Sequence, residues 1–449
     1  MLHKNHVEKA KLSRSLSLFE ATIYGVGVII GAGIYALIGE GVQIAGSMVW
    51  LSFVFGAIIA AFTALSYAEL SSLFPKTGAE FNFVKHAFRS NYLAFFTGYS
   101  GIFANLISVS VVALGFAGYL NGMTGINISF AAISLIILMT LLNFFGIKES
   151  AKYAVFSTIL EVFGIILIIL IGLPYLGSTN LFEVPDSKFF LSPVLFATSL
   201  IFFAFVGFEQ IANISEETKL ASKTIPKAVL LSLFITSMLY ILVSISVVSI
   251  YHWQEIAGAP NPMSLVAQKG FGENAGLLMS LIALFATSNT VLILLVVTSR
   301  MIYGISKQSA LPDILQTIHE KTNTPYIAVL LTGLLSLLFI FLKELDKVAL
   351  LSNYFIFTLF FLVNVSTIKM RISHPHLYRP FKIPFNIGEI PIVSVLGAIF
   401  CLFMLAQINT PIEIFGVELP LILFGFIISL SSIPIYILFK HTIPKHERI

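Results

Sequence analysis

Apolar runs long enough to cross a lipid bilayer recur from one end of this sequence to the other. A helix needs about 20 apolar residues to span the hydrocarbon core. Only 11% of the 449 residues are charged, whereas a soluble domain carries about 25%. A backbone in lipid must satisfy its hydrogen bonds within helices or a closed barrel. The runs therefore predict an all-α polytopic membrane protein that forms one integral membrane domain over residues 1–449.

The runs predict twelve transmembrane helices and a definite orientation. The spans are expected at about residues 18–45, 47–74, 91–121, 128–146, 151–176, 190–215, 226–251, 274–304, 325–342, 346–370, 389–409 and 419–439. With residues 1–17 in the cytoplasm, only four of the 26 basic residues fall outside: Lys188, Lys269, Lys343 and Lys347. The positive-inside rule therefore places both termini on the cytoplasmic side of the cell membrane.

Two connections between spans carry a prediction of their own. Residues 79–88 follow a Pro-Lys-Thr-Gly stop and are expected to form a short interfacial helix on the cytoplasmic side. Residues 252–273 mix polar and apolar types and are expected to form an extracellular lid.

The first span contains a glycine-rich stretch, GVGVIIGAGIYALIGEGVQIAG, over residues 25–46. Glycine is a poor helix former, so Gly31-Ala32-Gly33 is a predicted break in the helix. An opened backbone at membrane depth is tolerated only where protein or a cavity provides hydrogen-bond partners. We interpret the break as a site for a small zwitterion, with its carboxylate at the N-terminus of the second half-helix and its ammonium at the carbonyls that end the first.

The sixth span, SLIFFAFVGFEQIANISEE, contains a corresponding interruption at Gly207, which lies shortly before Glu209. Paired interrupted spans in corresponding positions of two halves indicate a transporter site between two repeats. The alternative is that Gly207 only lets two helices pack closely.

Several further segments carry a family resemblance over nearly the whole chain. They are GVGVIIGAGIYALIG, YAELSSLFPKTGAEFNFV, FFAFVGFEQIANISEE followed by KTIPKAV, RMIYGISKQSALP, TPYIAV and RPFKIP. Together they resemble the amino acid–polyamine–organocation (APC) transporters, and among these the prokaryotic amino acid permeases related to cationic amino acid transporters.

This resemblance implies a LeuT-type fold, with inverted five-helix repeats over residues 18–176 and 190–370 and two extra helices over 389–439. It implies secondary active transport of L-amino acids by alternating access. The implied substrate-binding residues are Ile30, Gly31, Ala32 and Gly33 in the first span, and Phe203, Ala204, Phe205 and Gly207 in the sixth. An aromatic residue of the sixth span commonly gates the substrate, which makes Phe205 and Phe208 the candidates.

Many relatives carry a lysine in the middle of the fifth span, where this sequence has Glu161. A buried carboxyl in apolar surroundings favours its protonated form, so Glu161 is a candidate site for a coupling proton. We expect it to face the first span and the cluster Thr287-Ser288-Asn289-Thr290. Two alternatives stay open: a sodium site with these oxygen ligands, and a protonated glutamate that only joins helices by hydrogen bonds.

Three other polar residues lie within predicted spans. Glu209 is expected to cap the half-helix that begins there, with a substrate side-chain cation as the alternative partner. Asn105 in the third span is expected either to line the pocket or to bind a neighbouring helix. Glu69 lies near the end of the second span, where snorkelling to the interface would suffice.

The remaining composition excludes several functional classes. The single cysteine and the scattered histidines exclude a disulfide framework and indicate no metal site, and no motif indicates a cofactor or a nucleic-acid partner. Uptake of polyamines or other amines and amino acid exchange remain alternatives on the same fold. A membrane-embedded enzyme using Glu161 and Glu209 is less favoured, because no nucleophile or metal motif accompanies them.

Overall fold

The computed structural model describes residues 16–31, 33–76, 78–145, 147–185, 191–307, 311–322, 324–414 and 417–439. The protein is an all-α polytopic membrane protein. Within the described residues, nine helical segments are long and apolar enough to cross a membrane, and three shorter apolar helices accompany them (Leu18–Ile30, Tyr326–Ile340 and Ile392–Gln407).

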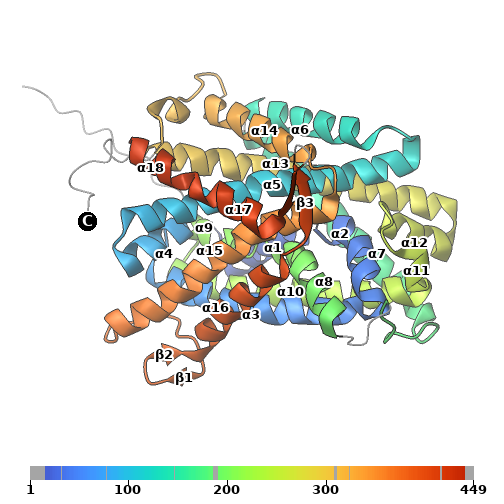
Figure 1. Cartoon of the computed structure of the whole chain (residues 1–449), viewed down its shortest axis with the longest axis horizontal. Helices are drawn as coiled ribbons and strands as arrows, with labels where there is room; N and C mark the ends of the chain where they lie inside the picture. Colours follow the sequence, from blue (N-terminus) through green and yellow to red (C-terminus); the bar gives the residue numbers. More distant parts are fainter. Residues whose placement is uncertain are drawn as a thin grey trace, which may run out of the picture.

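Among the described residues, the α-helices up to Ile201 are the following eight; Figure 1 shows how they are arranged. They are α1 Leu18–Ile30, α2 Gly33–Ala45, α3 Val49–Leu73, α4 Ala79–Phe88, α5 Asn91–Thr124, α6 Ile128–Phe145, α7 Ile147–Gly172 and α8 Leu191–Ile201. Short 3₁₀ turns follow α2, α7 and α8, at η1 Gly46–Met48, η2 Leu173–Tyr175 and η3 Phe202–Phe205.

The second half contributes ten more. They are α9 Gln210–Asn213, α10 Ala221–Ile250, α11 Trp253–Ile256, α12 Pro262–Phe271, α13 Glu273–Lys307, α14 Tyr326–Ile340, α15 Leu345–Ser373, α16 Ile392–Gln407, α17 Leu421–Leu430 and α18 Ser432–Phe439. Two further 3₁₀ turns are η4 Ser215–Glu217 and η5 Asp313–Gln316.

Two small antiparallel hairpins stand where the sequence predicts only loops and helix. They pair β1 Asn386–Ile387 with β2 Ile390–Pro391, and β3 Pro411–Ile414 with β4 Val417–Pro420. The predicted span over 419–439 therefore begins two residues late, at Leu421. It is also interrupted at Ser431, between α17 and α18.

Both predicted helix breaks are confirmed. The first helix begins with the capping box of Ser17 and Glu20 and ends at Ile30, where Gly31 has φ 21° and ψ −159°. In the sixth span, the 3₁₀ turn η3 is followed by extended Val206 and by Gly207 with φ 128°. A φ of this size is accessible to glycine and strained for other residues.

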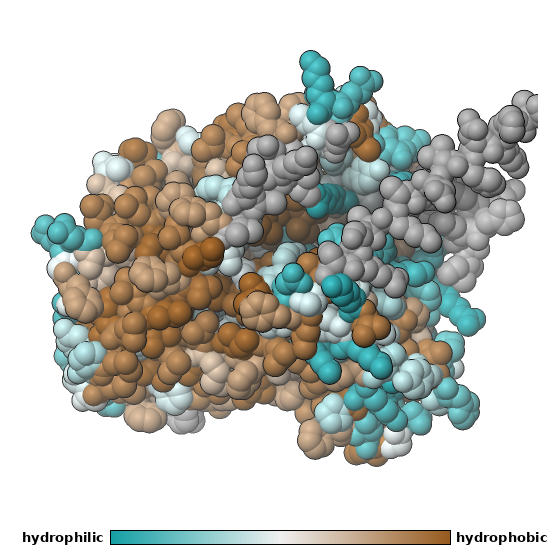
Figure 2. Space-filling view, turned by 180° about the vertical axis from the view of Figure 1, so that it is seen from behind, coloured by the Kyte–Doolittle hydropathy of each residue, from teal (hydrophilic) through white to brown (hydrophobic). Residues whose placement is uncertain are grey.

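The long helices pack side by side into one bundle. Figure 1 shows α6 and α14 along one side of the bundle next to α5 and α13, while α3 and α10 pack against each other on the other side. Helix α5 contacts both α13 and α15. Seen from behind, a broad apolar surface covers the molecule, with hydrophilic residues toward its margins, as expected for a lipid-facing surface (Figure 2).

The two connections also form helices. The predicted interfacial helix is α4, and its first amides, of Gly78 and Ala79, donate to Asn213 Oδ1 at 2.9 and 3.0 Å. Residues 252–273 contain α11 and α12, and the Gly258 amide donates to the Gly39 carbonyl of α2 at 3.0 Å. Helices α4 and α12 lie at opposite ends of the bundle, the α4 side and the α12 side (Figure 1).

Candidate functional site

The two broken spans cross at backbone contact. A Cβ atom built on Gly33 would lie 2.5 Å from the Cα of Ala204, and one built on Gly207 would lie 2.9 Å from the carbonyl oxygen of Val28. Real Cβ atoms do not approach other atoms so closely, so both contacts require glycine. The unwound segments of the first and sixth spans therefore lie against each other.

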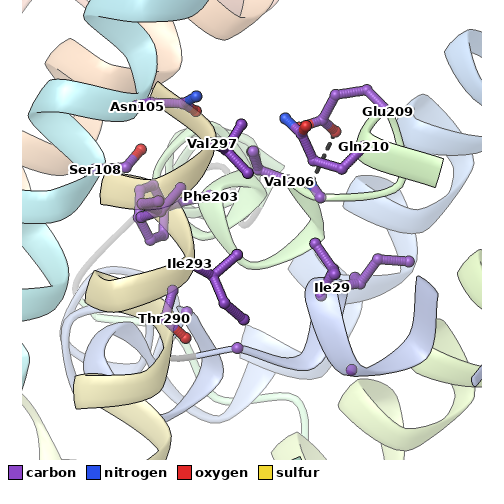
Figure 3. Close-up of a pocket in the computed structure, with 16 residues that line it drawn as sticks. Ile29, Asn105, Ser108, Phe203, Val206, Glu209, Gln210, Thr290, Ile293 and Val297 are labelled. Atoms are coloured by element: carbon purple, nitrogen blue, oxygen red, sulfur yellow. Dashed lines mark hydrogen bonds between the residues drawn. The ribbon is translucent and has the colours of Figure 1, made fainter. Parts of the chain in front are cut away.

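A pocket opens beside this crossing (Figure 3). Its lining comes from the two breaks, α5 and α13: Gly27, Val28, Ile29, Gly31, Gly33, Asn105, Ser108, Phe203, Val206, Gly207, Glu209, Gln210, Thr290, Ile293, Leu294 and Val297. Gly31, Gly33, Asn105, Phe203 and Gly207 are among the residues that the sequence singled out. Ala32, which it also singled out, lies outside the described residues.

The walls of the pocket differ in chemistry. Val206, Ile293 and Val297 are aliphatic and lie between Phe203 on one side and Glu209 on the other (Figure 3). Asn105 reaches the pocket from α5 and also donates to Met301 Sδ at 3.5 Å, so both roles considered for this residue are present. Ile293, Leu294 and Val297 of α13 were missed because nothing in an apolar run says which face of the helix points inward.

Glu209 is buried at the edge of the pocket, and its side chain accepts hydrogen bonds from residues before and after it in the chain. Its Oε2 accepts the amide of Gly207 at 2.8 Å, and its Oε1 accepts Gln210 Nε2 at 3.3 Å. The prediction that it caps the following half-helix is therefore corrected. Its side chain makes no capping bond to α9 and instead holds the amide exposed at the break itself.

The carbonyl groups that end α1 already have a protein partner. Tyr240 of α10 donates its hydroxyl to the carbonyl oxygens of Ile29 at 2.7 Å and Ile30 at 3.1 Å. Ile30 itself does not line the pocket. The sequence did not single out Tyr240, whose only signal was a phenol within an otherwise apolar span.

The two predicted aromatic gates face away from the pocket. Phe205 packs against Phe53 and Tyr240 with ring centroids 6.1 and 5.4 Å apart, and Phe208 packs against Tyr67 at 5.6 Å. Neither lines the pocket, and neither does Ala204, whose Cα is covered by Gly33.

The gating role of Phe205 and Phe208 stays a prediction. The structure shows that Phe203, within η3, lines the pocket, whereas Phe202 and Phe205 are buried in the core.

Glu161 lies outside the pocket lining, in contact with α13. Its Oε1 accepts Asn289 Nδ2 at 2.9 Å, and its backbone carbonyl accepts the hydroxyl of Tyr35 at 2.6 Å. Ser288, predicted to share this cluster, instead shares a hydrogen bond of 2.5 Å with the hydroxyl of Tyr153. Helix α13 still links the two places, because Thr290 of the same cluster lines the pocket.

The prediction that Glu69 snorkels to the interface is wrong. Its side chain is only 1% exposed and accepts both Nε and Nη2 of Arg371 at 2.6 Å. Arg379 Nε donates to it at 3.0 Å, and the amide of Ile383 donates at 2.9 Å. Glu69 is thus the centre of a buried charge network that joins α3 to α15 and to the RPFKIP segment.

Comparison with known proteins agrees with this architecture. The family profile described as "Amino acid permease" matches residues 16–431. The branched-chain amino acid permease BcaP of Bacillus subtilis is 32% identical over 422 residues, which cover 89% of each chain. The methylthioribose transporter of the same organism is 27% identical, with 88% of each chain covered.

A human relative extends the same likeness beyond bacteria. The cystine/glutamate transporter is 25% identical over 96% of this chain and 86% of its own. The family match covers nearly the whole described chain, including both helix breaks and the pocket. The chain therefore belongs to the amino acid permease family.

Proposed function

We propose that this protein is a secondary active transporter that carries a neutral aliphatic L-amino acid across the cell membrane. Its twelve spans would comprise two inverted repeats, over residues 18–176 and 190–370, and two extra helices, with both termini in the cytoplasm. The observation that carries the proposal is the crossing of two broken helices beside a pocket. Interrupted helices of this kind offer bare amides and carbonyls to a charged substrate.

The carboxylate of the substrate would bind at the start of α2. The first amides of a helix have no partner within it and carry a partial positive charge. The ammonium group would then lie toward the carbonyl groups around Gly207 and the carboxylate of Glu209. The Tyr240 hydroxyl already donates to the carbonyl oxygens of Ile29 and Ile30 at the end of α1. The ammonium group is therefore expected to lie toward the sixth span.

The side chain of the substrate would lie against Val206, Ile293 and Val297. Lining by aliphatic side chains favours an aliphatic substrate, because a buried charged or polar substrate group would lack partners there. The likeness to a branched-chain amino acid permease supports the same class. A polyamine has no carboxylate for the amides of α2, which counts against polyamine uptake.

Alternating access is supported by the unequal packing of the two half-helices. On the α12 side, α2 is closely covered: a Cβ built on Gly39 would lie 2.7 Å from the Ala259 carbonyl. On the α4 side, Ile23 and Tyr24 of α1 are 52% and 38% exposed. We infer a conformation closed toward the outside, in which α1 is the half that moves to release substrate into the cytoplasm.

Proton coupling through Glu161 is favoured over sodium coupling. A sodium ion prefers oxygen ligands, whereas Asn289 presents an N–H donor to Glu161. An amide donor tolerates both the ionised and the protonated carboxyl, since one oxygen stays available as an acceptor in either form.

Uptake into proteoliposomes tests the function. Radiolabelled leucine, isoleucine and valine should accumulate under an inward proton gradient, while lysine, glutamate and putrescine should not. Accumulation of putrescine without any amino acid would overturn the proposed substrate class. Uptake that occurs only when the proteoliposomes contain an unlabelled amino acid, and that does not respond to the proton gradient, would instead establish exchange.

Substitution at the crossing provides a structural test. Gly33→Ala places a methyl group against the Ala204 backbone, which should abolish uptake and lower the free energy of unfolding by about 1–3 kcal/mol. Gly304→Ala is the matched control, because a Cβ at Gly304 meets nothing within 4 Å. Normal uptake by both variants would contradict the role of the crossing.

A further inference from the structure

One face of α7 carries a row of proton-bearing groups. Tyr153, Ser157 and Glu161 are spaced four residues apart on the same helix. Residues at this spacing lie above one another, about 6 Å apart along the axis. The face is turned toward α13, since the Tyr153 hydroxyl shares a hydrogen bond of 2.5 Å with Ser288 and Glu161 binds Asn289.

The row runs from a partly exposed residue into the protein. Tyr153 is half-buried and lies three residues before the apolar segment Phe156–Tyr175. Ser157 and Glu161 are both 0% exposed. Under the proposed orientation, the Tyr153 end of α7 is cytoplasmic, so the row would lead from cytoplasmic water to the buried carboxyl.

Polar atoms along the row are left without partners. Within the part of the chain that the structure describes, Ser157 Oγ, Glu161 Oε2 and Asn289 Oδ1 make no hydrogen bond of regular geometry. The Ser157 hydroxyl is near enough to the Tyr153 hydroxyl to influence it as a hydrogen-bonding neighbour. Buried polar groups are nearly always satisfied by protein or by water, so Ser157 Oγ, Glu161 Oε2 and Asn289 Oδ1 can each take a further hydrogen bond.

Three phenols of the described chain lie in the neighbourhood of Glu161. Its carboxyl acts electrostatically on Tyr35, Tyr153 and Tyr240. The hydroxyls of Tyr35 and Tyr240 donate to backbone carbonyls. Among these three tyrosines of the described chain, Tyr153 is the one that lies near the N-terminal end of α7.

We propose that Tyr153 and Ser157, together with water beside Ser157, form a relay that carries the coupling proton between the cytoplasm and Glu161. Ser288, whose hydroxyl donates to the Leu284 carbonyl at 2.6 Å, holds the Tyr153 hydroxyl in position. When a proton moves from the cytoplasm to Glu161, each hydroxyl accepts a proton on a lone pair and donates its own proton to the next group. The last proton binds Glu161 Oε2, which neutralises the carboxylate. Release follows the reverse order, and each hydroxyl recovers its proton. This inference rests on the proposed function of Glu161 as the coupling site.

The experiment separates net proton movement from substrate movement. Leucine uptake driven by a proton gradient requires Glu161 to load and release protons, and an entrapped pH-sensitive dye reports the accompanying flux. Leucine counterflow at equal pH requires neither, because the carrier can shuttle with its proton in place. Counterflow therefore also serves as the measure of intact folding and substrate binding.

Three variants test the relay. Tyr153→Phe and Ser157→Val remove hydroxyls, and both should slow gradient-driven uptake and proton flux while counterflow stays at the parent rate. Ser157→Thr has nearly the shape of valine but keeps the hydroxyl, and it should restore the flux.

Two outcomes separate failure of the relay from failure of the coupling site. If Glu161→Gln loses gradient-driven uptake while Tyr153→Phe and Ser157→Val match the parent, the relay is overturned and the coupling site stands. If Glu161→Gln still accumulates leucine in response to the gradient, the proposed coupling function itself is overturned. Equal losses in Ser157→Val and Ser157→Thr would also overturn the relay, since the hydroxyl would not matter.

Discussion

Glu69 and Glu161 are both buried carboxylates on membrane helices, yet their surroundings are opposite. Glu69 accepts two bonds from Arg371, one from Arg379 and one from the amide of Ile383. The side chain of Glu161 accepts one bond, from the neutral amide of Asn289. A carboxylate that accepts hydrogen bonds from two arginines has its counter-charge beside it, whereas a carboxyl whose hydrogen-bond partner is a neutral amide has none from that partner.

The second arginine in the Glu69 network has a further balance. Arg379 Nη2 donates to the carbonyl oxygens of Met370 at 3.1 Å and His374 at 3.0 Å, at the C-terminal end of α15. Helix C-termini carry a partial negative charge, which favours a guanidinium there. The network therefore serves as a fixed joint between α3, α15 and the segment that follows, and it differs from Glu161 in having no free oxygen.

The largest expected effect breaks the saturated side of this comparison. Glu69→Gln leaves two buried guanidinium groups without their counter-charge, which should lower the free energy of unfolding by about 3–5 kcal/mol. Thermal unfolding in detergent measures the loss. Replacing Glu69, Arg371 and Arg379 together by methionine is the control and should be milder than Glu69→Gln, because no charge is then stranded. Equal melting temperatures for Glu69→Gln and the parent would contradict the role of Glu69 in joining these elements.

Glu80 of α4 provides an intermediate case outside the membrane spans. It is buried, and Tyr67 donates to it at 3.3 Å. Burial raises the pKa of Glu80 to about 7, from an ordinary value of 4.5. The folded protein therefore holds a proton on Glu80 that the unfolded chain releases between these values. The contribution of Glu80 to stability is fully present below about pH 4.5 and is lost as the pH rises to about 7.

This fall should approach about 3 kcal/mol as an upper bound, since one pKa unit corresponds to 1.36 kcal/mol. Melting temperatures from pH 5 to pH 8 measure it. Glu80→Gln should flatten the profile over this range. A Glu80→Gln profile as steep as that of the parent would assign the dependence to other groups.

The smallest expected effect on stability concerns Glu161. Glu161→Gln replaces a carboxyl that has one neutral partner, so the free energy of unfolding should change by less than about 1 kcal/mol. Gradient-driven accumulation should nevertheless be lost. Glu69→Gln is thus expected to lower stability with the pocket lining unchanged, whereas Glu161→Gln is expected to stop coupling with stability almost unchanged. A large loss of stability in Glu161→Gln would show that Glu161 joins helices, as Glu69 does.

Features that depend on local residues could be predicted from the sequence. The apolar runs, the capping box at Ser17, the short helix over 79–88 and the breaks at Gly31 and Gly207 all follow from backbone preferences within a few residues. The pairing of two breaks also predicted a site where they meet. For the same reason the family could be inferred, because its motifs lie largely at these breaks and turns.

Features that depend on partners far along the chain could not. Glu69 and Arg371 are 302 residues apart, and Tyr240 reaches α1 from 211 residues away. Whether Phe203 or Phe205 faces the pocket depends on the turn of η3 against its neighbours, which no apolar pattern specifies. The sequence by itself determined where helices form and break, since those energies are local. Only the tertiary structure decided which buried carboxylate lies beside arginines and which lies beside a neutral amide, because that depends on the groups that folding brings together.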